Sequence, residues 1–329
     1  MTTTARQFGS DTSAVFRDIR DRLVKSRRVV HHRRELLNDG DSSYVMTQCI
    51  KQGMLVRVAH GFYAESAKWA DLKPERQHVE YAQALARQHP DLQFSHATAA
   101  LVQGMPWKRW RIPAKLQCVV GSQTKRRSSA SVQRRHFDLD DKAIRHNGVL
   151  VTSAPRTVLD VACESEFAIG LACADYVLVR RLATKRQLLD AISENSHRYG
   201  IHRARLVVDL ADDRIESAGE SFCRAVIHQL GFVLPTLQHV FWDGRTLIGR
   251  GDFYWPESRV LVEFDGKVKY LDETMLAGRS TSEVVVEEKR REDRIRALGI
   301  KVIRLTWADL SSPDDIEQTL AGAGVPKRR

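Results

Sequence analysis

The sequence has few cysteines, no long apolar run and fewer acidic than basic side chains. Its five cysteines are scattered and form no CxxC pair, which argues against a disulfide framework and against a zinc site. No apolar run approaches the roughly 20 residues that cross a bilayer, and the N-terminus lacks the apolar stretch of a signal peptide. We therefore expect a reduced, cytoplasmic protein with no membrane partner.

The shortage of acids leaves a basic chain. Lys and Arg number 52 against 41 Asp and Glu, a formal net charge of +11. That balance favours a polyanionic partner, which we take to be DNA, although charge alone leaves RNA open. A length of 329 residues predicts two or three domains. We expect a multidomain fold of mixed α+β and α/β character, with boundaries at 1–70, 71–215 and 216–329.

The first domain reads as helix, short helix, turn, helix and hairpin. A helix ends near residue 25, a short one spans 32–37, and another runs from Ser42 or Ser43 to Gly53, with Val45, Met46 and Ile50 facing inward. This order predicts a winged helix-turn-helix, whose second helix enters the major groove. The alternative is a small protein-binding module with a solvated charged face. The predicted DNA contacts are Ser42, Ser43, Tyr44, Thr47, Gln48 and Lys51 on the helix and Arg57 and His60 on the wing.

The middle region, 71–215, predicts a mixed α/β domain with two basic clusters, "WKRWR" at 107–111 and "TKRR" at 124–127. Aromatic rings between basic side chains can stack on bases while the charges pair with phosphates. The alternative is a solvated surface with Trp half-buried beneath it. The predicted contacts are Lys108, Arg109, Arg111, Lys125, Arg126 and Arg127.

The last domain has the order αβββαβ followed by a final helix, and the strand Lys301–Leu305 is apolar enough to be central. In the strand 259–264 side chains alternate between faces, so Glu263 and Asp265 share one side, and a hairpin brings Asp252 beside them. Three such carboxylates repel one another unless a cation lies among them. Mg²⁺ or Mn²⁺ bound by oxygen ligands meets that need and can activate water against a phosphate.

Two stretches of sequence resemble known families. "CIKQGMLVRVAHGFYA" resembles the wing of AbiEi-type antitoxins and transcriptional regulators, and "SHATAALVQGMP" and "VTSAPRTVLDVA" recur in long proteins of that kind. "GDFYWPESRVLVEFDGKVKY", with flanking helices, resembles the DUF559 branch of the PD-(D/E)xK nuclease superfamily, related to very-short-patch repair endonucleases, over residues 216–310. The first resemblance implies operator binding and a toxin partner or phage-defence setting. The second implies a restriction-endonuclease-like domain.

The nuclease resemblance implies roles for particular residues. Asp252 and Glu263 would be metal ligands, joined by Asp265, which stands where the superfamily pattern has Lys. Lys267 and Lys289 are both candidates for the missing positive charge, with Lys289 preferred because a helix holds it. The alternative for Lys289 is a salt-bridged helix face. Glu220 would be the outer acid, or else part of a capping box with Ser217.

We therefore expect a metal-dependent DNA endonuclease. The alternative is a non-catalytic, operator-binding regulator in which the nuclease fold is silent. If both strands are cut, two active sites and hence a homodimer are expected.

Overall fold

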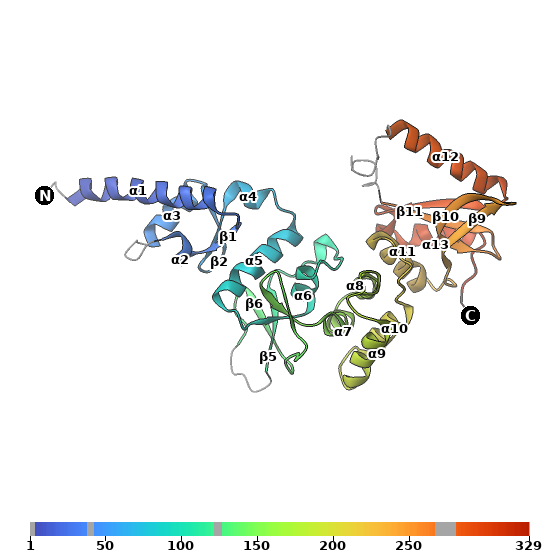
Figure 1. The fold of residues 1–329 in the computed structure, drawn as a ribbon, viewed down its shortest axis with the longest axis horizontal. Coiled ribbons are helices and arrows are strands. Elements are labelled where there is room, and N and C mark those ends of the chain that lie inside the picture. The colour runs from blue at the N-terminus through green and yellow to red at the C-terminus, as the bar shows by residue number, and fades with distance from the viewer. Residues whose placement is uncertain (1–3, 38–42, 122–126, 267–280, 329) are drawn as a thin grey trace. The chain divides into compact units, whose positions relative to one another are not determined.

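The computed structural model describes residues 4–37, 43–121, 127–266 and 281–328, and the chain divides into two compact units, 1–161 and 162–329 (Figure 1). Both units combine helices with β-sheet, which confirms the mixed α/β class. The sequence predicts boundaries after residues 70 and 215, whereas the packing of the chain changes after residue 161. None of the helices in the described ranges is both long enough and apolar enough to cross a membrane.

The first unit begins with a small helical core beside a hairpin. Its elements are α1 (Thr4–Lys25), β1 (Val30–His32), α2 (Arg33–Leu36), α3 (Ser43–Lys51), β2 (Leu55–Ala59), β3 (Phe62–Glu65) and α4 (Ser66–Ala70). The strands form a sheet in the order β1-β3-β2. Ile19, Leu36, Cys49 and Leu55 are among the side chains that bury against one another in this core. Gly53 ends α3 with a φ of +71°, a left-handed conformation that glycine adopts without strain.

Two details of this region differ from the sequence prediction. Ile50 is 37% exposed, and Cys49, not Ile50, lies on the buried face of α3. The reason is helical geometry, since Cys49 is four residues from Val45 and shares its face, while Ile50 is five residues away. Strand β1 was also not predicted. Its three residues pair with β3, some thirty positions later, and a short isolated run carries no periodicity of its own.

A second sheet completes the first unit. The elements are α5 (Pro74–Gln88), β4 (Gln93–Phe94), α6 (His96–Val102), a 3₁₀ turn (Arg109–Arg111), β5 (Leu116–Val120), β6 (Val132–His136), β7 (Ile144–His146), β8 (Val149–Val151) and α7 (Ala154–Glu164), which runs into the second unit. Its order is β6-β5-β4-β8-β7, with parallel and antiparallel pairs. Val30 and Phe62 bury in the same core as Tyr81 and Leu116, so the hairpin and this sheet share one apolar interior.

The second unit opens with helices: α8 (Phe167–Val179), α9 (Lys185–Glu194), α10 (Ile201–Leu210) and α11 (Ala218–Gln229). Nearly all of α8 is buried, and its sequence "FAIGLACADYVLV" is apolar apart from Asp175 and Tyr176, as expected of a helix enclosed by neighbours. Helix α8 packs on both α10 and α11.

The rest of this unit is a four-stranded sheet with helices on both faces (Figure 1). The elements are β9 (Thr236–Asp243), β10 (Thr246–Trp255), β11 (Val260–Asp265), α12 (Thr281–Ala297), β12 (Lys301–Thr306), a 3₁₀ turn (Asp309–Ser311) and α13 (Pro313–Gly322). Strands β9 to β11 are antiparallel neighbours, and β12 is parallel to β11. This is the predicted order of elements. The sheet order β12-β11-β10-β9 makes β12 an edge strand of the described sheet, so its predicted central position is wrong.

The two faces of this sheet have separate apolar cores. Val260, Val262 and Phe264 pack with side chains of α11 and α13, such as Ile227 and Leu320. Leu261 lies on the other face with Ile295 of α12. The alternation predicted for β11 is therefore confirmed, and it leaves Glu263 on the α12 face.

Candidate functional site

Two of the predicted acids lie side by side on adjoining strands. The register of β10 and β11 pairs Phe253 with Val262, so the next position of the ladder sets Asp252 opposite Glu263. Directly opposed side chains of an antiparallel pair have Cβ atoms about 5 Å apart. Like charges at that separation destabilise each other: burial raises the pKa of Glu263, and the charge of Asp252 raises it further.

Asp252 is held in place by the backbone of β11. Its Oδ2 accepts a hydrogen bond from the Phe264 amide at 2.8 Å, which reaches across the end of the strand pair. Its Oδ1 lies 3.4 Å from the Gln238 side-chain nitrogen, a long contact. Gln238 sits in β9 with a φ of +53°, an irregular position for a non-glycine residue in a strand.

Gln238 connects this pair to a third acid, Glu220, at the start of α11. The same amide nitrogen donates to Glu220 Oε2 at 3.0 Å. Burial raises the pKa of Glu220, and the nearby charge of Asp252 raises it further. Acids from α11, β10 and β11 therefore lie near one another at the end of the interior strand β11, brought together from positions 220, 252 and 263.

Glu220 also contacts the start of α11, but it does not complete the capping box that the sequence left open, because its carboxylate accepts from the Glu216 amide and not from the Ser217 amide. Ser217 is the N-cap of α11, and its Oγ accepts from the Glu220 amide at 3.2 Å while its hydroxyl donates to Glu220 Oε1 at 2.7 Å. The Glu216 amide donates to Glu220 Oε2 at 3.0 Å. The carboxylate is thus a helix-start partner and a neighbour of Asp252 at the same time.

The close approach of α11 to β11 depends on a glycine. A Cβ at Gly219 would lie 2.0 Å from Cε1 of Phe264, closer than any real contact. Any larger residue would push the helix start away from the strand end. Gly219 therefore allows Glu220 to reach the neighbourhood of Asp252.

Arg291 of α12 supplies the positive charge at Glu263. Its Nη2 lies 2.8 Å from Glu263 Oε1, and its Nη1 donates to the Arg250 carbonyl at 2.8 Å. Burial is the main influence on Glu263 and raises its pKa, while Arg291 opposes that rise. The two residues are 28 positions apart in the sequence, so the charge pattern of the helix does not reveal that Arg291 pairs with Glu263. Gln238 was missed for a similar reason, since nothing in its sequence neighbourhood marks it.

The remaining predicted site residues are placed as follows. Asp265 is half-buried at the end of β11, in register with Thr306 of β12. Lys289 is exposed on α12, and Lys267 lies outside the described residues. In the part of the chain that the structure describes, no three His, Cys, Asp or Glu side chains are spaced to hold one metal ion. The ligand set of Asp252, Glu263 and Asp265 stays a prediction.

The remaining charges of α12 bear out the salt-bridged alternative in part. Arg296 pairs with Glu292 one turn earlier at 2.7 Å, and Arg304 of β12 pairs with Glu292 at 2.7 Å and with Glu288 at 3.3 Å. The two Arg304 pairs join the helix to the edge strand. Arg291 differs from them in reaching an acid in the middle of the sheet.

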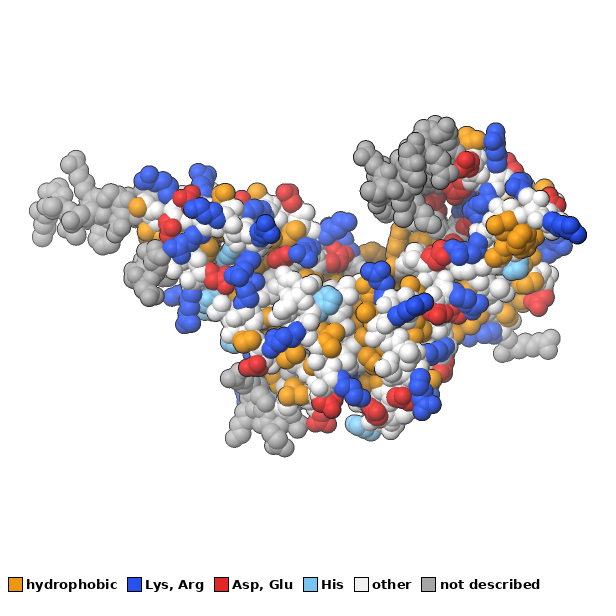
Figure 2. Space-filling model, viewed as in Figure 1, with side chains coloured by type: hydrophobic (Ala, Val, Ile, Leu, Met, Phe, Trp, Pro, Cys, Tyr) orange, Lys and Arg blue, Asp and Glu red, His pale blue; other side chains and the backbone are white. Residues whose placement is uncertain are grey.

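In the first unit, the outer face of α3 carries polar groups. Tyr44, Thr47 and Lys51 are exposed and Gln48 is half-buried, whereas Ser42 lies outside the described residues and Ser43 begins the helix. On the hairpin, Arg57 and His60 are exposed, and Arg57 Nη2 lies 2.9 Å from His60 Nδ1. Figure 2 shows Lys and Arg side chains spread over the visible surface of α1 and the elements beside it.

The two basic clusters of the middle region differ in how much is described. Arg109 and Arg111 are exposed, Lys108 is half-buried, and Trp110 is 70% exposed. Trp107 of the same cluster is half-buried, which agrees with the predicted alternative of a solvated surface over a half-buried Trp, whereas Trp110 is exposed. In the second cluster, Arg127 is exposed, and Lys125 and Arg126 lie outside the described residues.

Comparison with known proteins finds relatives, but none of them has a stated activity. No family model matches the chain. Two curated proteins of Mycobacterium tuberculosis, the uncharacterized proteins MT2308 and Rv2248, are each 32% identical to it over 160 residues, which cover 45% of this chain and 59% of the relative. The chain thus spans about three fifths of the length of these relatives. The crystal structure of the RV2827C protein from Mycobacterium tuberculosis aligns with 70% of this chain and 89% of its own at 15% identity, with a TM-score of 0.39, too low to establish a common fold.

Proposed function

We propose that the chain binds DNA through residues 1–161 and hydrolyses phosphodiester bonds at a metal-dependent centre in residues 162–329. The observation that carries this proposal is the meeting of Glu220, Asp252 and Glu263, acids from three elements joined through Gln238 and the β10–β11 register. The order of α11, three antiparallel strands, α12 and a parallel β12 supports it, because residues 216–310 resemble the DUF559 branch of the PD-(D/E)xK nucleases.

The donor chemistry of the acids fits a hard divalent cation. Mg²⁺ commonly uses one or two protein carboxylates and keeps several waters, so the pair Asp252 and Glu263 suffices as its protein ligands. Asp265, at the end of the same strand, is the proposed third oxygen ligand. When bound, Mg²⁺ or Mn²⁺ would lower the pKa of a water molecule and stabilise charge on the phosphate. Raised pKa values at Glu220 and Glu263 support this reading, since a nearby cation relieves crowded carboxylates.

The residues of the chain have distinct proposed tasks. The Phe264 amide fixes the direction of Asp252 through a 2.8 Å hydrogen bond. Glu220, which is 3% exposed, would accept a hydrogen bond from the Gln238 side chain. Gln238 would in turn position Oδ1 of Asp252. Arg291 now neutralises Glu263, and it would turn to the substrate phosphate once a cation took its place. Lys289 and Lys267 remain the proposed lysines for orienting the attacking water.

The second candidate function is a regulator that binds DNA without cutting it. The ion pair of Arg291 with Glu263 favours it, because a guanidinium at 2.8 Å already occupies one oxygen of the proposed ligand. In that case the acid pair is structural. The resemblance of residues 49–64 to AbiEi-type regulators supports DNA binding in either case, and it makes a toxin the proposed protein partner.

The DNA contacts follow from exposure and charge. Thr47 and Lys51 of α3 and Arg57 of the hairpin face solvent together with Tyr44 and His60. Such side chains would reach phosphates and base edges if α3 enters the major groove. The exposed Arg109, Trp110 and Arg111 offer a second contact, in which the indole stacks on bases beside two charges.

The deciding experiment is a nicking assay on supercoiled plasmid DNA. Nuclease activity predicts nicked or linear product with Mg²⁺ or Mn²⁺, none with EDTA, and none for Asp252→Asn or Glu263→Gln. Asp243→Asn, at the exposed end of β9, is the matched control and should cut like the wild type. Intact plasmid throughout, with tight binding to one operator fragment, would establish the regulator instead.

A further inference from the structure

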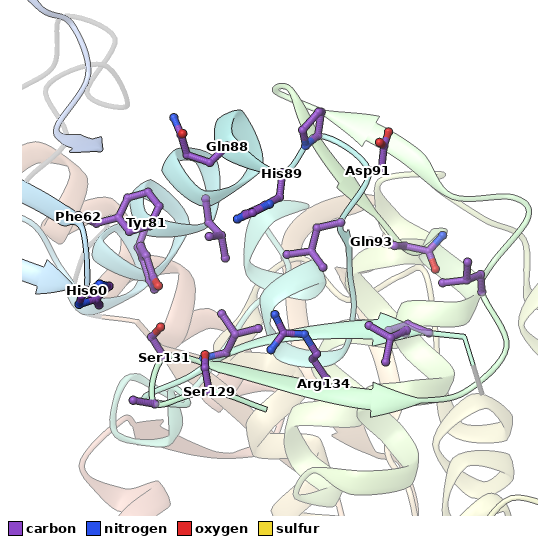
Figure 3. Close-up of a pocket in the computed structure, with 18 of the residues that line it drawn as sticks. His60, Phe62, Tyr81, Gln88, His89, Asp91, Gln93, Ser129, Ser131 and Arg134 are labelled. Atoms are coloured by element: carbon purple, nitrogen blue, oxygen red, sulfur yellow. The ribbon is translucent and has the colours of Figure 1, made fainter. Parts of the chain in front are cut away.

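A cavity in the first unit is lined by the hairpin, the end of α5 and strands β5 and β6 (Figure 3). Its volume is about 900 Å³, near the upper end of the range found for small-molecule sites. Tyr81, Leu85, Val120 and Val132 line it and form an apolar wall. The Tyr81 hydroxyl points toward Ser131 in Figure 3.

The polar lining of this cavity carries positive charge. Arg134 of β6 and His89 at the end of α5 point toward each other across the space (Figure 3), and His60 lines the hairpin side. The Arg134 guanidinium donates to the Arg127 carbonyl at 2.7 Å through Nη1. That bond fixes its direction without neutralising its charge. Asp91 is the acid in the described lining, so the positive charge is local to Arg134 and an anion would bind beside that side chain.

His60 connects the cavity to the wing. A guanidinium can only donate, so His60 Nδ1 must accept from Arg57 Nη2 at 2.9 Å, and the neutral ring then carries its proton on Nε2. A group bound in the cavity that accepts from Nε2 would stabilise this tautomer. Arg57 is an exposed residue of the hairpin face that the proposed function places on DNA.

We propose that this cavity binds a small organic anion with a flat apolar body. The anionic group, a carboxylate or a phosphate, pairs with Arg134, and the body packs on Tyr81 and Leu85. The ligand accepts a hydrogen bond from His60 and so fixes Arg57. An effect of the ligand on DNA affinity rests on the proposed function. Binding of the ligand to the cavity does not.

Binding is tested first without DNA. The probe is 8-anilinonaphthalene-1-sulfonate, titrated against the full chain by fluorescence, with 2-naphthoate, 2-naphthyl phosphate and neutral 2-naphthol as competitors. We expect one saturable site, competition by an anion but not by 2-naphthol, and a loss of affinity of at least about tenfold in Arg134→Gln. Competition by the carboxylate alone or by the phosphate alone identifies the anionic group.

Control variants separate this site from general dye binding. Arg145→Gln removes an exposed arginine of β7 outside the cavity and should leave dye affinity within twofold. Ala130→Trp fills the cavity from an exposed position and should abolish binding. Equal dye affinity in wild type, Arg134→Gln and Ala130→Trp, with unchanged circular dichroism, would overturn the proposal.

The link to the wing has its own readout. His60→Ala and Arg57→Ala should each weaken dye binding about threefold or more. His60 Nε2 is the donor to the ligand, and Arg57 holds His60 in the tautomer that carries this proton. No change in either variant would overturn the link. DNA fragment anisotropy with and without 2-naphthoate then measures coupling: dye binding without any DNA binding would refute the proposed function and leave the ligand site standing.

Discussion

Asp175 of α8 and Arg224 of α11 form an ion pair that is almost wholly buried. Arg224 Nη2 donates to both carboxylate oxygens, at 2.7 and 2.9 Å, and Ser221 Oγ and the Asp212 amide complete the group. Burial raises the pKa of Asp175 even though Arg224 opposes it. The pair joins α8 to α11, the helix that carries Glu220.

Asp175→Ala should lower the free energy of unfolding by about 3–5 kcal/mol, because it leaves Arg224 charged and buried without its carboxylate. Urea denaturation measures the change. Asp190→Ala breaks the exposed pair with Arg186 and should cost no more than about 1 kcal/mol. Similar losses in both variants would contradict the distinction between buried and exposed pairs.

Gly219→Ala should destabilise the second unit by about 1–3 kcal/mol, because its Cβ would meet the Phe264 ring. The matched control is Gly322→Ala in α13, where an added Cβ meets nothing within 4 Å and better helix propensity should make the change neutral or stabilising. Thermal unfolding followed by circular dichroism compares the two. A neutral Gly219→Ala would show that α11 does not approach β11 so closely.

Stability should fall as pH falls from about 6.5 toward 4 because of His78. Burial lowers its pKa to about 4 from an ordinary value near 6.5, and its ring contacts Thr98 Oγ1 at 2.8 Å. Between these values the unfolded chain binds the proton and the folded chain does not, so lower pH favours unfolding, by up to about 3 kcal/mol.

The test of this pH dependence is His78→Gln, which keeps a hydrogen-bonding side chain and removes the titration. Urea midpoints from pH 4 to 7 should show a weaker decline in this variant than in the wild type. His136→Gln changes an exposed histidine of β6 and should reproduce the wild-type decline. If the urea midpoints of all three proteins fall equally with pH, His78 is not the source of the pH dependence.

Arg291→Gln should raise the affinity for Mn²⁺ by about tenfold, because it removes a positive charge 2.8 Å from Glu263. Isothermal titration calorimetry measures the affinity. Arg294→Gln, on an exposed face of the same helix, is the control. No Mn²⁺ binding in either variant or in the wild type would favour the regulator over the nuclease.

Lys51→Gln should weaken DNA binding across sequences and reduce the magnitude of the salt slope by about one, if Lys51 contacts a phosphate. Anisotropy titrations at several salt concentrations give the slope. Lys142→Gln, exposed in the loop after β6, should leave it unchanged. An unchanged slope for Lys51→Gln would remove α3 from the proposed DNA interface.

Much of the fold could be predicted because its signals are local. Alternation along β11 was enough to place Val262 inward and Glu263 on the opposite face, and a short connection between β10 and β11 was enough to bring Asp252 beside it. Helices α5, α11 and α12 carry helical spacing or charge patterns of their own. Each of these features depends on neighbours within about a dozen residues.

The rest depends on contacts between distant positions. Only the folded chain pairs Arg291 with Glu263, joins Glu220 to Asp252 through Gln238, and puts β12 at the edge of the sheet rather than at its centre. Composition and periodicity describe which face a side chain takes, but not which partner from another element will meet it there. The sequence by itself therefore determined the acids, their strands and their shared face. The tertiary structure decided that an arginine lies against one of them, because long-range packing chooses the partner of a buried charge.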